Sequence, residues 1–310
     1  MEKSIKVFAP ATISNIGCGF DTMGFAIDEP GDIVIVKKNK LNKLRITKIT
    51  GDQGKIPKII EQNTATGALL PMLKGLDIGF GFDIEIRKKM PICSGLGSSA
   101  ASAVGAVVAL NELLDKPLST EKLLNFALQG EKIASGAIHA DNVAPCLYGG
   151  FILARDYDPL DIIKIPSPKN LYCSVIYSDV RISTNEARKL IKKSIPLKKA
   201  RKHFGNVGAL VKGLMTNDID LIGRSVVDEI SEPARRHLIP GYDEIKQSAL
   251  DNGAVACNIS GSGPSVFAFS NSKQKAEKIG LAMKHVVTKL KIKNNLYISK
   301  INQIGPKIIS

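Results

Sequence analysis

One glycine-serine stretch constrains the fold more than any other part of the chain: PICSGLGSSAASAVGAVVAL, residues 91–110. Gly95 and Gly97 stand directly before a run of small residues that is long enough for a helix. Glycine reaches positive φ and lets a ligand approach the backbone, and Ser98 and Ser99 are suited to cap the helix. Free N–H groups and the positive end of the helix dipole then favour an anion such as phosphate. A plain turn before a helix would give the same string.

This loop fits neither of the two common nucleotide-binding patterns. It lacks the Lys of G-x-x-x-x-G-K-[ST], and it does not lead into a G-x-G-x-x-G unit with an acidic residue ~20 positions further on. The residues that follow the loop, AASAVG at positions 100–105, carry almost no side-chain bulk. Such a helix is expected where a nucleotide or another stretch of backbone lies against it.

Length and composition describe a globular chain with two domains. The 310 residues exceed the ~150 of one average domain, and 44% of them are hydrophobic. No apolar run approaches the ~20 residues of a membrane span, and we expect a cytoplasmic protein. Five single cysteines without C-x-x-C spacing and four histidines without i, i+4 spacing argue against a disulfide framework and a transition-metal site.

The net charge of +14 is compatible with a nucleic-acid partner, an anionic substrate or a general compositional bias. The basic residues gather in VKKNK (36–40), RKK (87–89), KK (192–193) and KKARKH (198–203). These runs have little aromatic interleaving, so we interpret them as solvated faces; nucleic-acid binding is the alternative from a different functional class.

The pattern of the chain predicts an α+β protein with a domain boundary near residue 160. Short alternating runs in the first ninety residues predict a sheet, followed by helices from residue 98 to 114 and from Ser119, the N-cap, to Ser135. In the second half, Ser183 and Glu186 have capping-box spacing, and residues 206–226, 240–253 and 272–290 favour helices. A strand-turn-strand pattern surrounds NISGSGPSVFAF, residues 258–269.

Three segments together resemble the motifs of the GHMP small-molecule kinases. PICSGLGSSAASA resembles their second motif, APATISNIGCGFDTMGFAID at residues 9–28 resembles the N-terminal motif, and residues 258–269 resemble the C-terminal glycine motif. The resemblance implies a two-domain fold: an N-terminal domain like ribosomal protein S5 domain 2 (1–160) and a ferredoxin-like C-terminal α/β sandwich (161–310). It also implies ATP, Mg²⁺, an active site between the domains and a homodimer.

Two positions resemble the homoserine branch of this family. Several members carry Lys or Arg early in the first motif, where this chain has Thr12. Mevalonate-type members place a carboxylate seven residues before the glycine pair 149–150, where this chain has Asn142. The expected acceptor is therefore L-homoserine; the alternative is a GHMP kinase that acts on a mevalonate-pathway alcohol or a sugar.

The resemblance also assigns site residues. It assigns ATP binding to Pro91, Ser94, Gly95, Leu96, Gly97, Ser98, Ser99, Ala100 and Ala101. It assigns substrate binding to Asn15, Asp21, His139, Asp141, Arg188, Arg235, Gly261, Ser262 and Gly263. It gives catalytic roles to Asn142, which would orient the reacting hydroxyl, and to Glu131, which would hold Mg²⁺ with Ser99.

The charges of an amino-acid acceptor give these assignments a physical basis. An ammonium and a carboxylate call for one fixed anion and one or two guanidinium groups. By resemblance, Asn15 and Asp21 hold the amino end, and Arg188 and Arg235 hold the carboxylate. Taken singly, each of these residues fits a structural role better than a binding role, and it is their joint fit to one zwitterion that favours the assignment.

Glu131 has an argument of its own from helical spacing. It follows Leu124, Ala127 and Leu128 at i, i+3, i+4 and i+7, which places a carboxylate on an apolar stripe. A buried carboxylate needs a partner, and a structural ion pair would serve as well as a metal ion.

Overall fold

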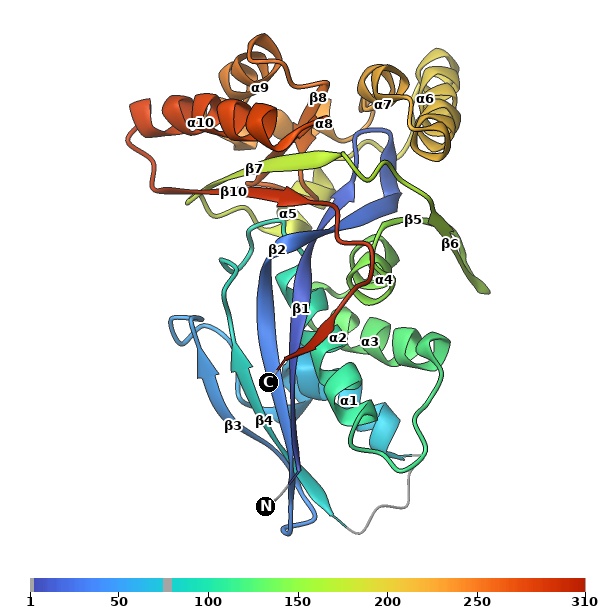
Figure 1. Cartoon of the computed structure of the whole chain (residues 1–310), viewed down its shortest axis with the longest axis vertical. Helices are drawn as coiled ribbons and strands as arrows, with labels where there is room; N and C mark the ends of the chain where they lie inside the picture. Colours follow the sequence, from blue (N-terminus) through green and yellow to red (C-terminus); the bar gives the residue numbers. More distant parts are fainter. Residues whose placement is uncertain (1–2, 75–79, 310) are drawn as a thin grey trace.

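The structure is a computed structural model that describes residues 3–74 and 80–309, and these residues form two domains stacked along the long axis of the molecule (Figure 1). Each domain packs helices on a β-sheet. The two long strands at the start of the chain run through the lower domain and reach the upper one. No helix within the described ranges is long and apolar enough to cross a membrane.

The first domain is built on a mixed sheet. Its strands are β1 (Ser4–Asn15), β2 (Gly19–Asn39), β3 (Leu44–Thr50), β4 (Gly81–Arg87), β5 (Phe151–Tyr157), β6 (Leu160–Ile165) and β11 (Lys307–Ile309). They follow the order β11-β1-β2-β4-β3, while β5 pairs with β2 and with β6. From Ala9 onward every residue of β1 is buried, because this half of the strand is covered on both faces.

Helices cover one face of this sheet (Figure 1). They are α1 (Thr64–Lys74), α2 (Ser98–Asn111), α3 (Thr120–Ser135) and α4 (Ala140–Tyr148), with a short 3₁₀ turn, η1 (Ile60–Gln62). The small residues of α2 allow the helix to lie close to the strands: a Cβ added at Gly105 would come within 2.7 Å of Val34 and 3.5 Å of Ala9. The sequence left open a contact of this helix with a nucleotide or with another stretch of the chain. At Gly105 the contact is with the chain itself, through the side chains of Val34 and Ala9 on the strands.

The second domain has the strand order of a ferredoxin-like sheet. Its strands are β7 (Tyr172–Ser178), β8 (Ala256–Ile259), β9 (Val266–Ser270) and β10 (Asn294–Lys300). They are antiparallel in the order β10-β7-β9-β8, so the predicted ferredoxin-like domain is confirmed. The helices are α5 (Thr184–Lys189), α6 (Leu197–Thr216), α7 (Ile219–Ser225), α8 (Glu232–Arg235), α9 (Tyr242–Asp251) and α10 (Lys273–Lys289), with a 3₁₀ turn, η2 (Arg236–Leu238).

Aromatic side chains join the two domains into one core. Phe25 stacks on Phe151 at a centroid distance of 4.8 Å, and both belong to the first sheet. Phe269 and Phe267 of β9 lie 5.2 Å and 5.9 Å from Phe25. Because aromatic pairs bury large apolar areas, this cluster fixes the second domain on the first.

Some elements differ from the sequence-based expectation. The chain from 206 to 226 forms the end of α6 and all of α7 instead of one helix, because Asn217 adopts the left-handed conformation (φ 57°) and the Asp218 side chain caps α7. Helix α1, helix α4 and the β5–β6 hairpin were not predicted. The domain boundary predicted near residue 160 falls at the first residue of β6, a strand of the first sheet. Strand β11, near the end of the chain, also belongs to the first sheet.

Candidate active site

A cavity of about 550 Å³ opens between the two domains. The predicted site residues that line it are Asn15, Asp21, Ser94, Gly95, Gly97, Ser98, Ser99, Glu131, His139, Asp141, Asn142, Arg188, Arg235, Gly261 and Ser262. The other predicted residues do not line it: Pro91, Leu96, Ala100, Ala101 and Gly263. Leu96, Ala100 and Ala101 are fully buried in the core, so any contact they make with a ligand is through the backbone.

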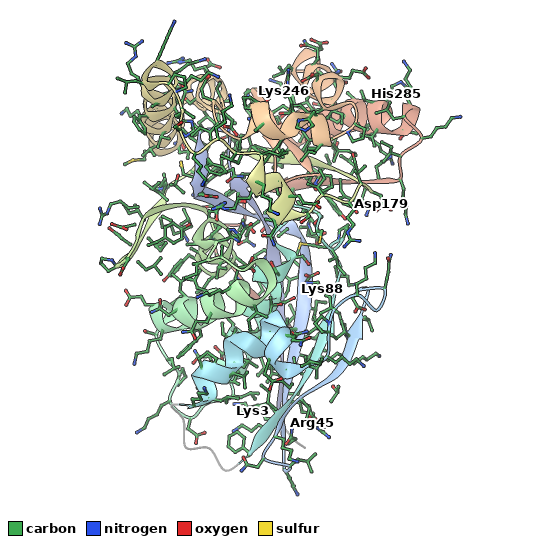
Figure 2. The ribbon with its side chains drawn as sticks, turned by 180° about the vertical axis from the view of Figure 1, so that it is seen from behind. Lys3, Arg45, Lys88, Asp179, Lys246 and His285 are labelled. Atoms are coloured by element: carbon green, nitrogen blue, oxygen red, sulfur yellow. The ribbon has the colours of Figure 1, made fainter. Side chains whose placement is uncertain are left out.

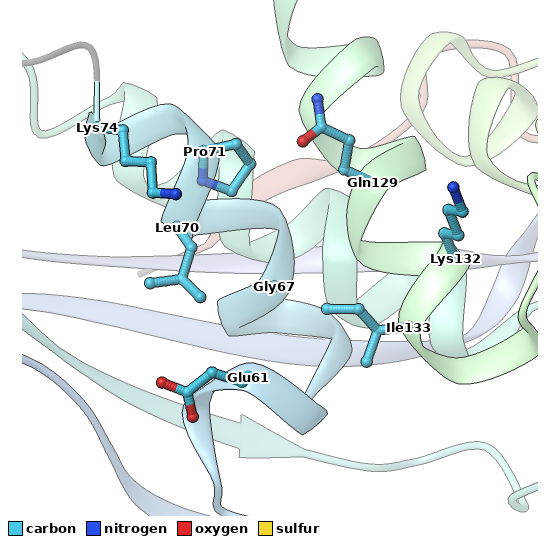
Figure 3. A pocket seen from close by; sticks show the side chains of 8 residues that line it. All are labelled: Glu61, Gly67, Leu70, Pro71, Lys74, Gln129, Lys132 and Ile133. Carbon is cyan, nitrogen blue, oxygen red and sulfur yellow. The ribbon is translucent and has the colours of Figure 1, made fainter.

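A second, open cavity of about 500 Å³ lies between α1 and α3 (Figure 3). Its lining, which includes Glu61, Lys74 and Lys132, contains none of the predicted site residues. The three sequence motifs therefore converge on the interdomain cavity.

Residues 94–99, which we call the phosphate loop because the sequence predicts an anion there, need their two glycines for the conformation of the loop. Gly95 and Gly97 have φ of 77° and 65°, as the sequence predicts. A Cβ at Gly97 would lie 1.9 Å from Thr12 Oγ1, and a Cβ at Gly95 would lie 2.4 Å from the carbonyl oxygen of Ser260. The loop is thus pressed against the first motif on one side and the C-terminal motif on the other.

Ser98 does not cap α2, contrary to expectation. The N-cap residue is Gly97, and the Ser98 hydroxyl donates instead to Asp32 Oδ2 at 2.8 Å. Since the N-cap residue has no side chain, it cannot satisfy the N–H groups of the first turn of α2. These groups, at the positive end of a 14-residue helix that lines the cavity, fit an anion such as a nucleotide phosphate.

The C-terminal glycine motif supports this loop directly. The Ser260 hydroxyl donates to the carbonyl oxygen of Gly95 at 2.6 Å, and the Ser265 N–H donates to that of Ser94 at 3.2 Å. The Gly261 N–H donates to the carbonyl oxygen of Ser14, in the first motif, at 3.2 Å. The interdomain contacts therefore tie all three motifs together.

Asp21 and Arg188, which the resemblance assigns to opposite ends of the substrate, form an ion pair with each other. Arg188 Nη1 and Nη2 lie 3.1 Å and 2.6 Å from the two oxygens of Asp21. The Arg188 side chain is 43% exposed and the Asp21 side chain 33% exposed. The pair bridges the two domains at the cavity. Asn15 donates to the Gly261 carbonyl oxygen at 2.8 Å and accepts from the Asp21 N–H at 3.1 Å.

Arg235 provides a second, deeply placed guanidinium group. It is 3% exposed and donates to the carbonyl oxygens of Ala187 at 3.2 Å and Gly261 at 3.3 Å. Burial lowers the pKa of Arg235 from its ordinary value, and nearby Asp21 partly offsets this effect.

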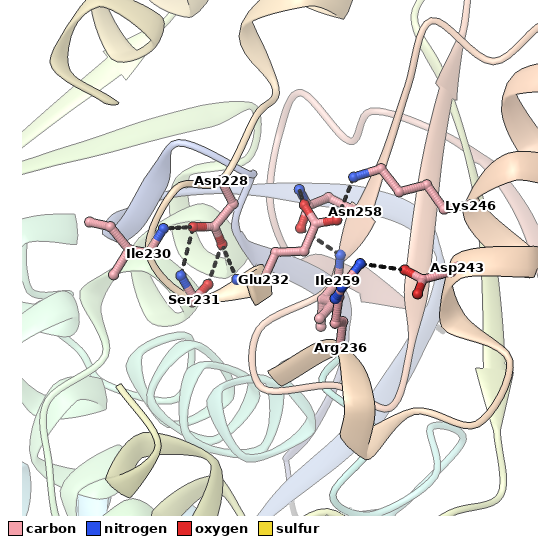
Figure 4. Close-up of polar contacts among 9 residues, drawn as sticks. All are labelled: Asp228, Ile230, Ser231, Glu232, Arg236, Asp243, Lys246, Asn258 and Ile259. Carbon is pink, nitrogen blue, oxygen red and sulfur yellow. Dashed lines mark hydrogen bonds and ion pairs between the residues drawn. The ribbon is translucent and has the colours of Figure 1, made fainter. Parts of the chain in front are cut away.

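A polar network holds the short helix that carries Arg235 (Figure 4). Asp228 accepts hydrogen bonds from the N–H groups of Ile230 and Ser231, each at 2.7 Å, and of Glu232 at 2.8 Å. Glu232 in turn accepts from Asn258 at 2.8 Å and pairs with Lys246. These contacts fix the start of α8 three residues before Arg235, so the guanidinium group is positioned from a rigid support.

Asn142 and Thr12, the two positions that resemble the homoserine branch, contact each other. Thr12 Oγ1 donates to Asn142 Oδ1 at 2.9 Å. Because Thr12 uses the amide oxygen, the two N–H donors of the Asn142 amide remain for a ligand in the cavity that Asn142 lines. His139 is the N-cap residue of α4, and Asp141 and Asn142 lie in the first turn of this helix.

A cluster of carboxylates and one imidazole lies beside Asn142. Glu131 is 4% exposed on the buried face of α3, as predicted, and its Oε1 lies 3.5 Å from His139 Nδ1. This contact raises the pKa of His139. Burial raises the pKa of Asp141 to about 7, and Asp141 Oδ1 has no hydrogen-bond partner among the described residues.

The donor set fits Mg²⁺. The Ser99 hydroxyl and the Glu131 carboxylate line the same cavity as the free N–H groups of α2. Magnesium prefers hard oxygen ligands and takes few of them from a protein, keeping water and phosphate oxygens for the rest.

Sequence reasoning missed two charged residues under the loop. Lys88 belongs to the run RKK, which we interpreted as a solvated face; this is wrong for Lys88, whose side chain is 2% exposed and pairs with Asp32. A single charge within a basic run carries no signal that distinguishes it from its exposed neighbours.

Comparison with known proteins agrees with this geometry. The family models "GHMP kinases N terminal domain" and "GHMP kinases C terminal" match residues 63–150 and 210–289. Together with a phosphate loop at a domain interface, these matches define a class, the small-molecule kinases, and the chain belongs to the GHMP kinase family.

Within the family, the chain is similar over its full length to proteins named homoserine kinase. It is 46% identical to that of Chlorobium phaeobacteroides, covering 99% of this chain and 100% of the relative, and 45% identical to that of Chlorobaculum tepidum, covering 99% of each. The crystal structure of homoserine kinase from Cytophaga hutchinsonii matches with a TM-score of 0.97 at 53% identity, covering 100% of this chain and 98% of the other.

Proposed function

We propose that this protein transfers the γ-phosphoryl group of ATP to the side-chain hydroxyl of L-homoserine and releases O-phospho-L-homoserine. The observation that carries the proposal is the interdomain cavity, which brings the phosphate loop together with one fixed anion, Asp21, and two guanidinium groups, Arg188 and Arg235. An amino acid that carries a hydroxyl group matches this set of charges.

Positioning is the main contribution of the chain to the transfer. The N–H groups of residues 95–99 hold phosphate oxygens, Asp21 and Asn15 hold the ammonium group, and Arg188 and Arg235 hold the carboxylate. Ser99 and Glu131 would hold Mg²⁺, which supplies charge neutralisation when it is bound to the nucleotide phosphates.

Asn142 orients the acceptor hydroxyl through its N–H groups. Its Oδ1 accepts from Thr12, and a neutral amide oxygen is too weak a base to take the hydroxyl proton. In a loose phosphoryl-transfer transition state the proton leaves late, and a phosphate oxygen or water accepts it. The reaction then needs no dedicated protein base.

The test is ADP release from Mg·ATP with L-homoserine, D-homoserine, L-serine, L-threonine, mevalonate and galactose as separate acceptors. Turnover confined to L-homoserine is expected. Turnover with mevalonate or galactose and none with homoserine would retain a GHMP kinase and contradict the acceptor assignment.

Two arginine variants test the carboxylate site. We expect Arg188→Ala and Arg235→Ala each to raise the KM for homoserine by about 10- to 100-fold, while the KM for ATP stays near the wild-type value. Unchanged homoserine KM values in both variants would contradict the assignment. By resemblance to the family, we further propose that the enzyme is a cytoplasmic homodimer.

A further inference from the structure

A buried ion pair lies directly beneath the phosphate loop. Lys88 follows β4 and pairs with Asp32 of β2, and the two side chains are 2% and 0% exposed. Lys88 Nζ also donates to the Ser98 carbonyl oxygen at 2.7 Å and to Ser102 Oγ at 2.8 Å. The ammonium group thus contacts the first and second turns of α2.

Every lone-pair direction of the Asp32 carboxylate is used. Oδ1 accepts from the N–H groups of Lys89 at 2.7 Å and Met90 at 3.0 Å, and Oδ2 accepts from the Ser98 hydroxyl at 2.8 Å as well as from Lys88. One carboxylate therefore links β2, the segment that enters the loop, and the first residue of α2.

Stability alone is a weak reason for such a pair. Removing two charges from water costs free energy that their attraction often only offsets, and an apolar pair of similar volume can be equally stable. The orientation of this pair gives a second reason. Lys88 lines the interdomain cavity and Asp32 does not, so the cationic member of the pair is the one that lies next to the place where phosphate would bind.

We propose that Asp32 and Lys88 are positioning residues for the nucleotide. The pair holds Ser98, and with it the N–H groups of residues 95–99, in the arrangement that accepts phosphate oxygens, and it keeps a fixed cation beneath the start of α2. This inference rests on the proposed function only in that the loop binds a nucleotide.

The decisive variant is the double substitution Asp32→Asn/Lys88→Met, which removes both charges and leaves neither unpaired. Each single substitution strands one buried charge, so Asp32→Asn and Lys88→Met are expected to lower the Tm strongly. The double variant is expected to recover most of this loss. Its Kd for ADP, measured by calorimetry without an acceptor, is expected to stay about tenfold or more above the wild-type value.

A matched control exists on the same sheet. Arg45 and Asp83 also form an ion pair, with two hydrogen bonds, but it lies at the exposed edge between β3 and β4 and does not line the cavity. Figure 2 places Arg45 at the lower end of the molecule and Lys88 in its middle. Asp83→Asn is expected to leave the ADP Kd unchanged.

A milder variant keeps the inference testable if the charge variants fail to fold. Ser98→Ala removes one hydrogen bond to Asp32 and preserves the ion pair, and it is expected to weaken ADP binding severalfold with little change in Tm. Wild-type ADP affinity in Ser98→Ala or in the folded double variant would overturn the inference, as would an equal loss in Asp83→Asn.

The outcomes separate this inference from the proposed function. If the wild type binds ADP but does not turn over homoserine, the proposed function is contradicted. The ADP Kd values of the same variants then still decide whether the pair positions the nucleotide. Homoserine turnover combined with full ADP affinity in the double variant would contradict only the role of the pair.

Discussion

The phosphate loop and the Asp21–Arg188 pair face the same cavity, yet they are held in different ways. The loop is fixed by buried contacts to the first motif, to the C-terminal motif and to Asp32. Asp21 and Arg188 are 33% and 43% exposed, and they satisfy each other across the domain interface. Under the proposed function, the loop is built in advance for its ligand, whereas the two charges proposed for the acceptor are paired with each other.

This difference determines what each ligand must do on binding. A phosphate group meets N–H donors that are already in place, which keeps the cost of reorganisation low. An acceptor must replace one ion pair by two new ones, and only a ligand with both charges can compensate both partners. The two halves of the site should therefore respond differently to substitution.

The largest effect is expected from Gly97→Ala. The added Cβ would lie 1.9 Å from Thr12 Oγ1 at a φ of 65°, so the loop must move away from its phosphate-binding geometry. We expect the ADP Kd to rise roughly 100-fold. Gly208→Ala is the matched control because nothing lies within 4 Å of its added Cβ on α6, and this variant should bind ADP normally. Normal ADP affinity in Gly97→Ala would mean that the loop is not built in advance.

Asn142→Ala should separate positioning of the acceptor from nucleotide binding. The substitution removes the N–H donors that face the cavity and leaves the loop intact, so kcat is expected to fall about 10- to 100-fold with an ADP Kd within a factor of about two. Single-turnover kinetics and calorimetry measure the two quantities. Unchanged turnover would remove Asn142 from the mechanism.

The sequence predicts the loop well because its requirements are local. Positive φ at Gly95 and Gly97, and the burial of Glu131 on one face of a helix, follow from residue type and spacing within a few positions. The strand order of the second domain is also predicted, although only through the resemblance of the sequence to a family.

Contacts between distant residues could not be predicted. The Thr12–Asn142 hydrogen bond spans 130 positions, and a basic run gives no indication that Lys88 is buried. Helix α1 escaped prediction because Gly67 and Pro71 lie inside it, and both residue types usually interrupt helices. In α1, packing of its buried residues against α2 and α3 outweighs the local propensity.

Asp21→Asn tests whether the acceptor charges really are paired in the free protein. The substitution weakens binding of the ammonium group, so the homoserine KM should rise about 10- to 100-fold. It also releases Arg188, so γ-hydroxybutyrate, which carries only a carboxylate, should bind severalfold more tightly than it does to the wild type.

Arg188→Gln is the mirror experiment. It releases Asp21, and aminopropanol, which carries only an ammonium group, should then bind severalfold more tightly, while homoserine binds more weakly. If neither singly charged alcohol gains affinity in its variant, the ion pair does not compete with the substrate, and the contrast between the two halves of the site is lost.

The smallest effect concerns the pH dependence of stability at Asp141, which lines the same cavity. Its folded pKa of about 7 exceeds the ordinary 3.8, because burial outweighs the attraction of His139, and Asp21 and Glu131 add to the rise. The folded state therefore binds the proton more tightly, and the free energy of unfolding falls as pH rises through this window. Asp141→Asn removes that loss, so its Tm relative to wild type should increase from pH 5 to pH 8 by a few degrees, on the order of 2 kcal/mol.

Asp156→Asn provides the control for this trend. Hydrogen bonds from the N–H groups of Asp158 and Tyr157 lower the pKa of Asp156 below 3.8, so its ionisation is complete well below pH 5. Its Tm difference from wild type should be the same at pH 5 and pH 8. If the Tm difference between Asp141→Asn and wild type were also the same at pH 5 and pH 8, Asp141 would be charged at both pH values. The acceptor half of the site would then contain a second fixed anion beside Asp21, despite the burial of Asp141.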